Sequence, residues 1–167
     1  ALTSTFISSY RRLGVLAELT IDGYRQRPLD ERREGFMLAE MGAAVLLRRL
    51  PAGQEPAAGA IELIDTACAS EAQDMIRTRP TMPALEHVAG RLLPGRRIDV
   101  LHPHAPGTRV HDPAELSTLL RVLGSDPDRP RQPSNVPLAD VYAVKGAIGH
   151  GLGAAGLASL VVAALAL

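Results

Sequence analysis

Two histidine-bearing stretches of the chain hold the residues best suited to chemistry. The first, HPHAPGTRVHD, contains His104, and the second, VKGAIGHGLGAAG, contains Lys145 and His150. Imidazole and ammonium groups donate hydrogen bonds, and a cluster of such donors stabilises negative charge that develops on a carbonyl oxygen. If the two stretches meet in space, these three side chains predict a site that activates a carbonyl compound.

Each stretch follows a run of residues that is typical of a buried strand. His104 comes after the strand predicted in RRIDVLHPH, and Lys145 comes after the strand predicted in VPLADVYAV. A helix is predicted between them over 112–124, with Asp112 as its N-cap. Because the carboxyl ends of parallel strands meet at one edge of a sheet, we expect His104 to lie close to Lys145 and His150.

The remaining segments continue this alternation of helices and strands. Further helices are predicted over 1–16, 82–93 and 151–167, and further strands over 43–47 and 60–69. The segment PAGQEPAAG, between the last two, is a linker rich in proline, glycine and alanine. This order of elements predicts an α/β layer with parallel strand pairing.

Composition limits the kind of protein. A chain of 167 residues is long enough for one globular unit, and its 18 basic and 18 acidic side chains do not favour nucleic acid as a partner. The single cysteine excludes an internal disulfide, and the lack of a charged and apolar leader favours a cytoplasmic, reducing environment. The apolar run of 17 residues at the end lacks the anchoring residues of a membrane span, so we expect a buried core helix and no membrane.

Three stretches taken together resemble the signatures of one enzyme family. RPLDERREGF, HAPGTRVHDPAE and KGAIGHGLGAAG occur in the order and at roughly the spacing of three motifs of the beta-ketoacyl synthases, the condensing enzymes of fatty acid and polyketide synthesis. The resemblance covers nearly the whole chain and implies the thiolase-like α/β fold. It implies that 1–50 form the end of the first thiolase-like half, 51–58 a linker, and 59–167 most of the second βαβαβα half of a longer protein.

The resemblance also implies roles for individual residues. His104 and His150 would donate hydrogen bonds to the thioester carbonyl while a malonyl group loses carbon dioxide, and Lys145 would add positive potential beside them. Thr108 would bind the pantetheine arm of an acyl carrier protein, and Phe36 would belong to the substrate-binding residues. The family needs no metal or organic cofactor, its partner is acyl carrier protein, and its members are homodimers or ketosynthase heterodimers.

The chain departs from the family pattern near these residues. Ser159 stands where the family commonly has a glutamate, so a buried Lys145 would need another acceptor, such as Glu115 or a backbone carbonyl. Pro106 replaces a threonine that has a hydrogen-bond donor, and AEMGAA replaces a GxGAG phrase. These departures leave a second function open, namely a non-catalytic subunit, comparable to chain-length factors, that pairs with an active synthase.

Cys68 has the local sequence of the family's nucleophile, but it lies at a different place. The family's cysteine precedes the RPLD-like motif, whereas IDTACAS follows it. Acidic residues come soon after Cys68, and acidic neighbours oppose formation of a thiolate. We therefore expect Cys68 to be a mostly buried strand residue and the nucleophile to lie outside this chain.

The residues alone also allow simpler interpretations. His104 is compatible with a solvated loop residue, His150 with the start of a helix, Lys145 with a surface lysine and Phe36 with a plug in the core. A metal site would use His102, His104 and His111, but their spacing matches no common zinc pattern and no cysteine assists them, so no metal is expected.

Overall fold

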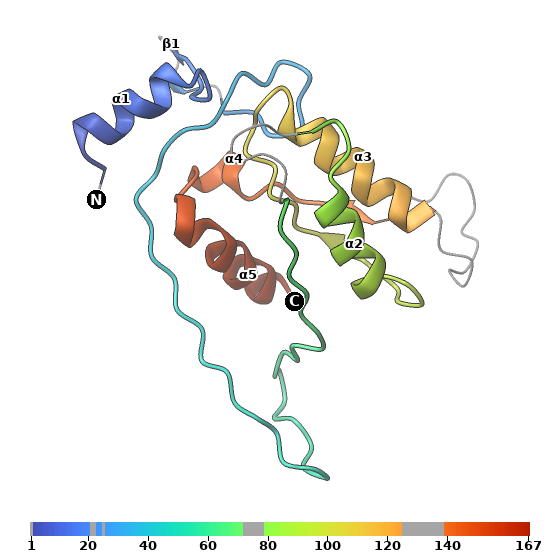
Figure 1. Ribbon diagram of the computed structural model, residues 1–167. Coiled ribbons are helices and arrows are strands. Elements are labelled where there is room, and N and C mark those ends of the chain that lie inside the picture. Colours follow the sequence, from blue (N-terminus) through green and yellow to red (C-terminus); the bar gives the residue numbers. More distant parts are fainter. Residues whose placement is uncertain (1, 21–22, 25, 72–78, 125–138) are drawn as a thin grey trace.

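Helices make up most of the regular structure in the computed structural model, which describes residues 2–20, 23–24, 26–71, 79–124 and 139–167. The helices are α1 (Ser4–Arg12), α2 (Pro83–Leu92), α3 (His111–Gly124), α4 (Lys145–Ile148), the 3-10 helix η1 (Leu152–Ala154) and α5 (Ala155–Ala166). β1 (Leu19–Thr20) pairs with β2 (Gly23–Tyr24) in the antiparallel sense, and β3 (Val100–Leu101) pairs with β4 (Asp140–Val141) in the parallel sense. Figure 1 shows α2 and α3 side by side, apart from α1 and α5.

The parallel pair β3 and β4 positions the two histidine-bearing stretches. Val100 lies opposite Asp140 and Leu101 opposite Val141, and the N–H of Tyr142 extends the ladder by donating to the carbonyl of Leu101 at 3.0 Å. Both strands therefore end at the same edge. The predicted parallel pairing is confirmed, and so are the helices predicted around α1, α2 and α3.

The start of α3 differs from the prediction. The helix begins at His111, whose N–H donates to the Thr108 hydroxyl at 3.2 Å. Asp112 is fully buried, and its carboxylate accepts hydrogen bonds from the N–H groups of Gly107, Thr108 and Leu29, each at about 3.0 Å. The prediction of Asp112 as N-cap is therefore wrong, because this carboxylate ties the loop before α3 to the loop at 29 instead.

Segment 36–39 joins the first and last parts of the described chain. On one side it forms a parallel bridge between Leu16 and Phe36, and on the other a parallel bridge between Leu38 and His150. Gly35 enters this segment with a φ of 146°, and a Cβ there would lie 2.5 Å from the carbonyl oxygen of Val15. Only glycine allows so close an approach of two backbones.

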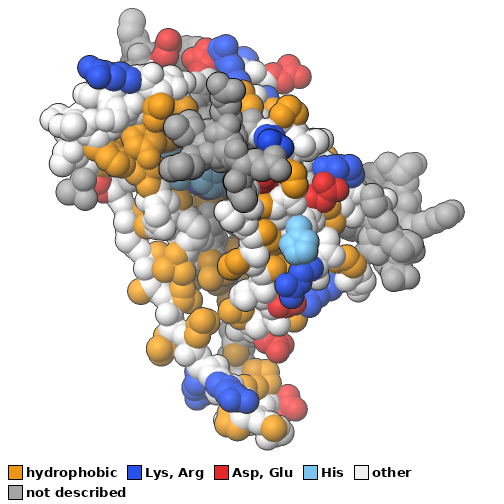
Figure 2. Space-filling view, in the orientation of Figure 1, with side chains coloured by type: hydrophobic (Ala, Val, Ile, Leu, Met, Phe, Trp, Pro, Cys, Tyr) orange, Lys and Arg blue, Asp and Glu red, His pale blue; other side chains and the backbone are white. Residues whose placement is uncertain are grey.

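The strands predicted over 43–47 and 60–69 are absent, and this expectation is wrong. Figure 1 shows the chain between 40 and 70 passing around the helices as an extended coil, and Figure 2 shows apolar side chains on this part of the surface. Exposed apolar side chains there include those of Val45, Leu46, Leu47, Ile61, Leu63 and Ile64, and Cys68 is exposed as well. A strand needs a neighbour to receive its backbone hydrogen bonds, and no described segment pairs with either run.

The fully buried residues of helix α5 are small. Ala155, Ala158 and Ser159 are buried, whereas Leu160 and Leu165 are exposed. The prediction of a buried core helix thus holds for one face and is wrong for the other. No helix among the described residues is long and apolar enough to cross a membrane.

Candidate active site

The two predicted histidines meet at the edge formed by the ends of β3 and β4. The ring centroids of His104 and His150 lie 5.0 Å apart, with their planes at 73°. Both side chains line a pocket of about 640 Å³. The predicted convergence of the two stretches is confirmed, while the chemical role of the residues remains a prediction.

His150 is held in one orientation and one tautomer. Its ring is buried, its backbone N–H donates to the carbonyl of Met37 at 2.8 Å, and its Nδ1 accepts the N–H of Leu152 at 3.0 Å. Since Nδ1 is an acceptor, the proton of the neutral ring sits on Nε2. Burial, followed by the charge of Lys145, lowers the pKa of His150 to about 4. The ring is therefore a neutral donor at pH 7.

His104 is fixed mainly through its backbone. Its N–H and that of Ala105 donate to the two oxygens of Glu115, at 2.6 and 2.7 Å. Desolvation lowers the pKa of the His104 ring, and Lys145, His111 and His150 lower it further. His104 is exposed to solvent, which screens these effects, but desolvation of the ring and the charge of Lys145 both favour the neutral form.

Lys145 lies inside the structure and is the only lysine of the chain. Its side chain is 2% exposed, and Nζ donates a hydrogen bond to the backbone carbonyl of His104. Burial lowers the pKa of Lys145, while the carboxylates of Glu115 and Asp112 raise it. Of the two acceptors expected in place of the missing glutamate, Glu115 or a backbone carbonyl, the structure shows a backbone carbonyl, and the interpretation as a surface lysine is wrong. Ser159 donates within α5 instead, to the carbonyl of Ala155 at 3.0 Å.

Thr108 and Phe36 line the same pocket as the two histidines. The Phe36 ring lies 4.8 Å from that of His150, and the backbone carbonyl of Thr108 accepts a hydrogen bond from Arg33 Nε at 3.2 Å. Gly107, with a φ of 98°, packs so closely that a Cβ would lie 2.6 Å from the carbonyl oxygen of Gly35. The RPLDERREGF and HAPGT stretches therefore form one wall.

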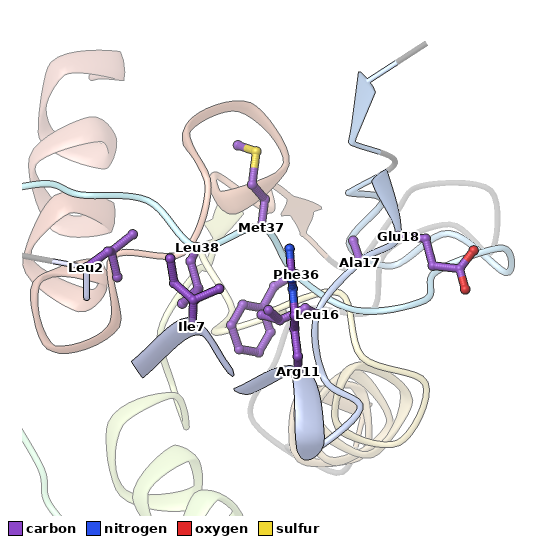
Figure 3. A pocket seen from close by; sticks show the side chains of 9 residues that line it. All are labelled: Leu2, Ile7, Arg11, Leu16, Ala17, Glu18, Phe36, Met37 and Leu38. Atoms are coloured by element: carbon purple, nitrogen blue, oxygen red, sulfur yellow. The ribbon is translucent and has the colours of Figure 1, made fainter. Parts of the chain in front are cut away.

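Phe36 also separates this pocket from a second one under α1. That second pocket has a volume of about 400 Å³. Figure 3 shows the residues that line it, which are Leu2, Ile7, Arg11, Leu16, Ala17, Glu18, Phe36, Met37 and Leu38. The Phe36 ring is buried, as expected of a core plug, and it also lines both pockets, while its role in substrate binding remains a prediction.

Sequence reasoning did not give a site role to His111, which it considered only as a metal ligand. The His111 ring lies 5.1 Å from the His104 ring, its Nε2 lies 3.7 Å from Oε2 of Glu115, and it lines the pocket. The start of a predicted helix directly after the HAPGT stretch was the signal available. Among the described residues, no group of three histidine, cysteine or acidic side chains is arranged to hold a metal ion.

Comparison with known proteins identifies a family for most of the chain. The model of the family described as beta-ketoacyl synthase, C-terminal domain, matches residues 71–167. This range includes both histidine-bearing stretches, Lys145 and His111.

Individual relatives are similar over most of the chain. An erythronolide synthase of Saccharopolyspora erythraea is 32% identical over 157 residues, which are 89% of this chain and 5% of that protein. A 3-oxoacyl-acyl-carrier-protein synthase 2 of Mycobacterium leprae is 29% identical over 84% of this chain and 32% of its own length. The tetracenomycin polyketide synthase ketoacyl synthase alpha subunit of Streptomyces glaucescens is 34% identical over 86% of this chain and 33% of its own length. The chain thus spans about a third of the latter two relatives.

Proposed function

Since the chain belongs to the beta-ketoacyl synthase family, we propose that it is part of an enzyme that condenses acyl and malonyl thioesters in fatty acid or polyketide synthesis. Relatives named as 3-oxoacyl-acyl-carrier-protein and polyketide synthases support this class of reaction. The observation that carries the proposal is that the imidazole rings of His104 and His150 lie together in one pocket.

In the proposed reaction the two histidines stabilise an enolate. The thioester oxygen of a malonyl group accepts hydrogen bonds from the ring N–H groups of His104 and His150. When the bond to the carboxylate breaks, carbon dioxide leaves and its electron pair passes into the enolate, whose negative charge rests largely on that oxygen. Fixed donors aimed at a developing oxyanion typically accelerate such a step by about 10²- to 10³-fold each.

Lys145 supports this step from behind the histidines. Its ammonium holds the backbone carbonyl of His104 and adds positive potential that favours neutral imidazoles and a negatively charged enolate. The backbone N–H of His104 donates to Glu115, so the backbone atoms that carry the imidazole ring are held in place. Such preorganised positioning requires no rearrangement when charge develops.

The enolate carbon then attacks the carbonyl carbon of an acyl thioester, so that a carbon–carbon bond forms, the carbon–sulfur bond breaks and the sulfur leaves as a thiolate. The nucleophile that carries this acyl group lies outside the chain in our proposal. Cys68 is exposed and lies in a coil rather than at the N-terminus of a helix. A coil lacks the aligned backbone N–H groups of a helix N-terminus, so this position does not favour a nucleophile.

The larger architecture and the partners extend the same proposal. We assign 1–50 to the end of a first thiolase-like half, 51–58 to a linker and 59–167 to a second βαβαβα half; the family match to 71–167 supports the last of these. Acyl carrier protein would deliver both thioesters, with Thr108 and Phe36 at the approach to the histidines. We further propose that the complete protein forms a homodimer or a ketosynthase heterodimer and that it is located in the cytoplasm.

A condensation assay on the complete protein tests the proposed function. Acyl and malonyl carrier proteins are supplied together, and mass spectrometry follows the 3-oxoacyl carrier protein, which we expect to form. Loss of carbon dioxide without 3-oxoacyl product would favour the alternative function, a chain-length-factor-like subunit. Pro106, which lines the pocket, also favours this alternative. A radiolabelled acyl group found covalently on Cys68 would contradict the placement of the nucleophile outside this chain.

A further inference from the structure

A continuous row of aromatic rings runs through the structure and ends at His111. Successive ring centroids lie between 4.8 and 5.9 Å apart along the row. In order, its members are Phe6, Tyr10, Phe36, His150, His104 and His111. The two proposed catalytic rings therefore lie inside the row, between a buried aromatic group and one further imidazole.

The two inner histidines are held by different means. The ring of His150 is fixed by the bond from Leu152 to its Nδ1 and by the ring of Phe36. The hydrogen bonds of His104 to other described residues, in contrast, involve its backbone N–H and carbonyl. Its ring contacts the ring of His150 and the ring of His111, and each pair of ring planes meets at an angle of 73°.

The backbone of His111, whose ring contacts that of His104, is fixed at the start of α3. This residue occupies the first position of α3, where its backbone N–H donates to Thr108 and its Nε2 lies 3.7 Å from the carboxylate of Glu115. The same carboxylate accepts the backbone N–H of His104. The backbone of His104 is thus held to α3 through Glu115, and the ring next to it belongs to the same helix.

We propose that His111 is a positioning residue that sets the ring orientation of His104 through their edge-to-face contact. The inference rests on the proposed decarboxylation, and it goes beyond the resemblance, which gives position 111 no role. Edge-to-face ring pairs prefer a defined geometry over free rotation. Without the His111 ring, the N–H of His104 would point at the oxyanion for a smaller fraction of the time, and the chemical step would slow while substrate binding stayed the same.

Three substitutions of His111 in the complete protein distinguish the effect of its aromatic ring from the effect of its polar nitrogen atoms. Decarboxylation of malonyl carrier protein is followed by release of carbon dioxide. We expect His111→Ala and His111→Asn to lower kcat about three- to tenfold with little change in KM, and His111→Phe to keep kcat within about threefold of the original value. His87→Ala, at an exposed histidine on α2, is the matched control.

The pattern among the variants decides the inference. It is overturned if His111→Ala leaves kcat unchanged, or if His111→Asn retains activity and His111→Phe loses it, since a polar contact would then be responsible. A higher KM with unchanged kcat would also overturn it, because His111 would then bind substrate rather than position His104. Thermal unfolding of each variant identifies any that fail to fold. If His111→Ala fails to fold, His111→Phe, which preserves an aromatic ring, still tests the inference: a large loss of kcat in this variant would overturn it.

A second measurement keeps this inference separate from the proposed function. The ring nitrogens of His104 are observed by NMR in complete protein labelled with ¹⁵N-histidine, in the absence of substrate. We expect His111→Ala to shift the His104 signals, and His87→Ala to leave them in place. Unchanged His104 signals in His111→Ala would overturn the inference even in an active enzyme. A wild-type protein that releases no carbon dioxide would contradict the proposed function alone.

Discussion

At the scale of single residues, the chemistry that we propose depends on keeping two imidazoles neutral. Nδ1 of His150 accepts the Leu152 N–H, and protonation of Nδ1 would place two donors face to face. Burial and the charge of Lys145 oppose protonation in the same direction. The preference for the neutral form is therefore built into both the contacts and the charges around this ring.

This preference predicts how stability depends on pH. The pKa of His150 is lowered from 6.5 to about 4 in the folded protein, so the unfolded chain binds more protons between these values. We expect the free energy of unfolding to fall by about 2 kcal/mol as the pH drops from 6.5 to 4, with His104 contributing in the same direction. Well above pH 6.5 the ring is neutral in both states, so this group then adds no pH dependence.

Chemical denaturation at a series of pH values measures the effect. His150→Gln should remove much of the slope below pH 6.5, whereas His87→Gln, at an exposed position, should preserve it. A slope that survives in His150→Gln as in the original chain would show that other groups are responsible.

Lys145 gives a second prediction at this scale. Because it is the only lysine of the chain and is 2% exposed, amine-acylating reagents should leave it unmodified in the folded protein and modify it after denaturation. Peptide mass spectrometry resolves the modified position. Rapid modification in the native state would contradict the buried contact between its ammonium and the His104 carbonyl.

At the scale of elements, the sequence was informative where a pattern is local. Helices α2 and α3 follow from their apolar spacing and from a proline near each start, and β3 and β4 follow from short apolar runs before the histidine-bearing stretches. The run at 43–47 looks equally apolar, yet it is an exposed coil because strand formation depends on a partner. The contact of His111 with His104 was not predicted, because α3 begins at His111 and the sequence had indicated Asp112 as the N-cap.

The close approach of Gly107 to Gly35 predicts a large effect from a single methyl group. Gly107→Ala would put a Cβ 2.6 Å from a carbonyl oxygen at a φ of 98°, so we expect a loss of about 2–3 kcal/mol in unfolding free energy. Gly90→Ala is the matched control, since it lies in α2 with open space around it and should be neutral or stabilising by up to about 1 kcal/mol. Equal stabilities of the two variants would contradict the packing of these loops.

At the scale of the whole molecule, apolar groups are divided between a small core and an exposed segment. The core includes Leu119 and Leu123 of α3 together with Phe36 and Val144, whereas leucines between 46 and 50 are exposed. An apolar segment of this kind is typical of a surface that another protein segment covers. This division agrees with a chain that spans about a third of its synthase relatives.

Replacing a buried leucine and an exposed leucine by alanine, in separate variants, tests whether the core and the exposed segment are distinct. Leu123 is 2% exposed and Leu46 is 95% exposed. In the 167-residue chain we expect Leu123→Ala to lower the free energy of unfolding by about 2–5 kcal/mol, because it leaves a cavity. Leu46→Ala should change it by less than about 0.5 kcal/mol. Comparable losses from both would show that the segment around Leu46 is part of the core.

The most direct measurement of the central claim is the rate at which the complete protein decarboxylates malonyl carrier protein when each paired histidine is removed. His104→Ala and His150→Ala should each lower kcat about 100-fold, because each removes one donor from the same oxyanion. His87→Ala, made in parallel, should retain the original rate. Unaltered rates in His104→Ala and His150→Ala would contradict the claim that these two neutral imidazoles carry the chemistry.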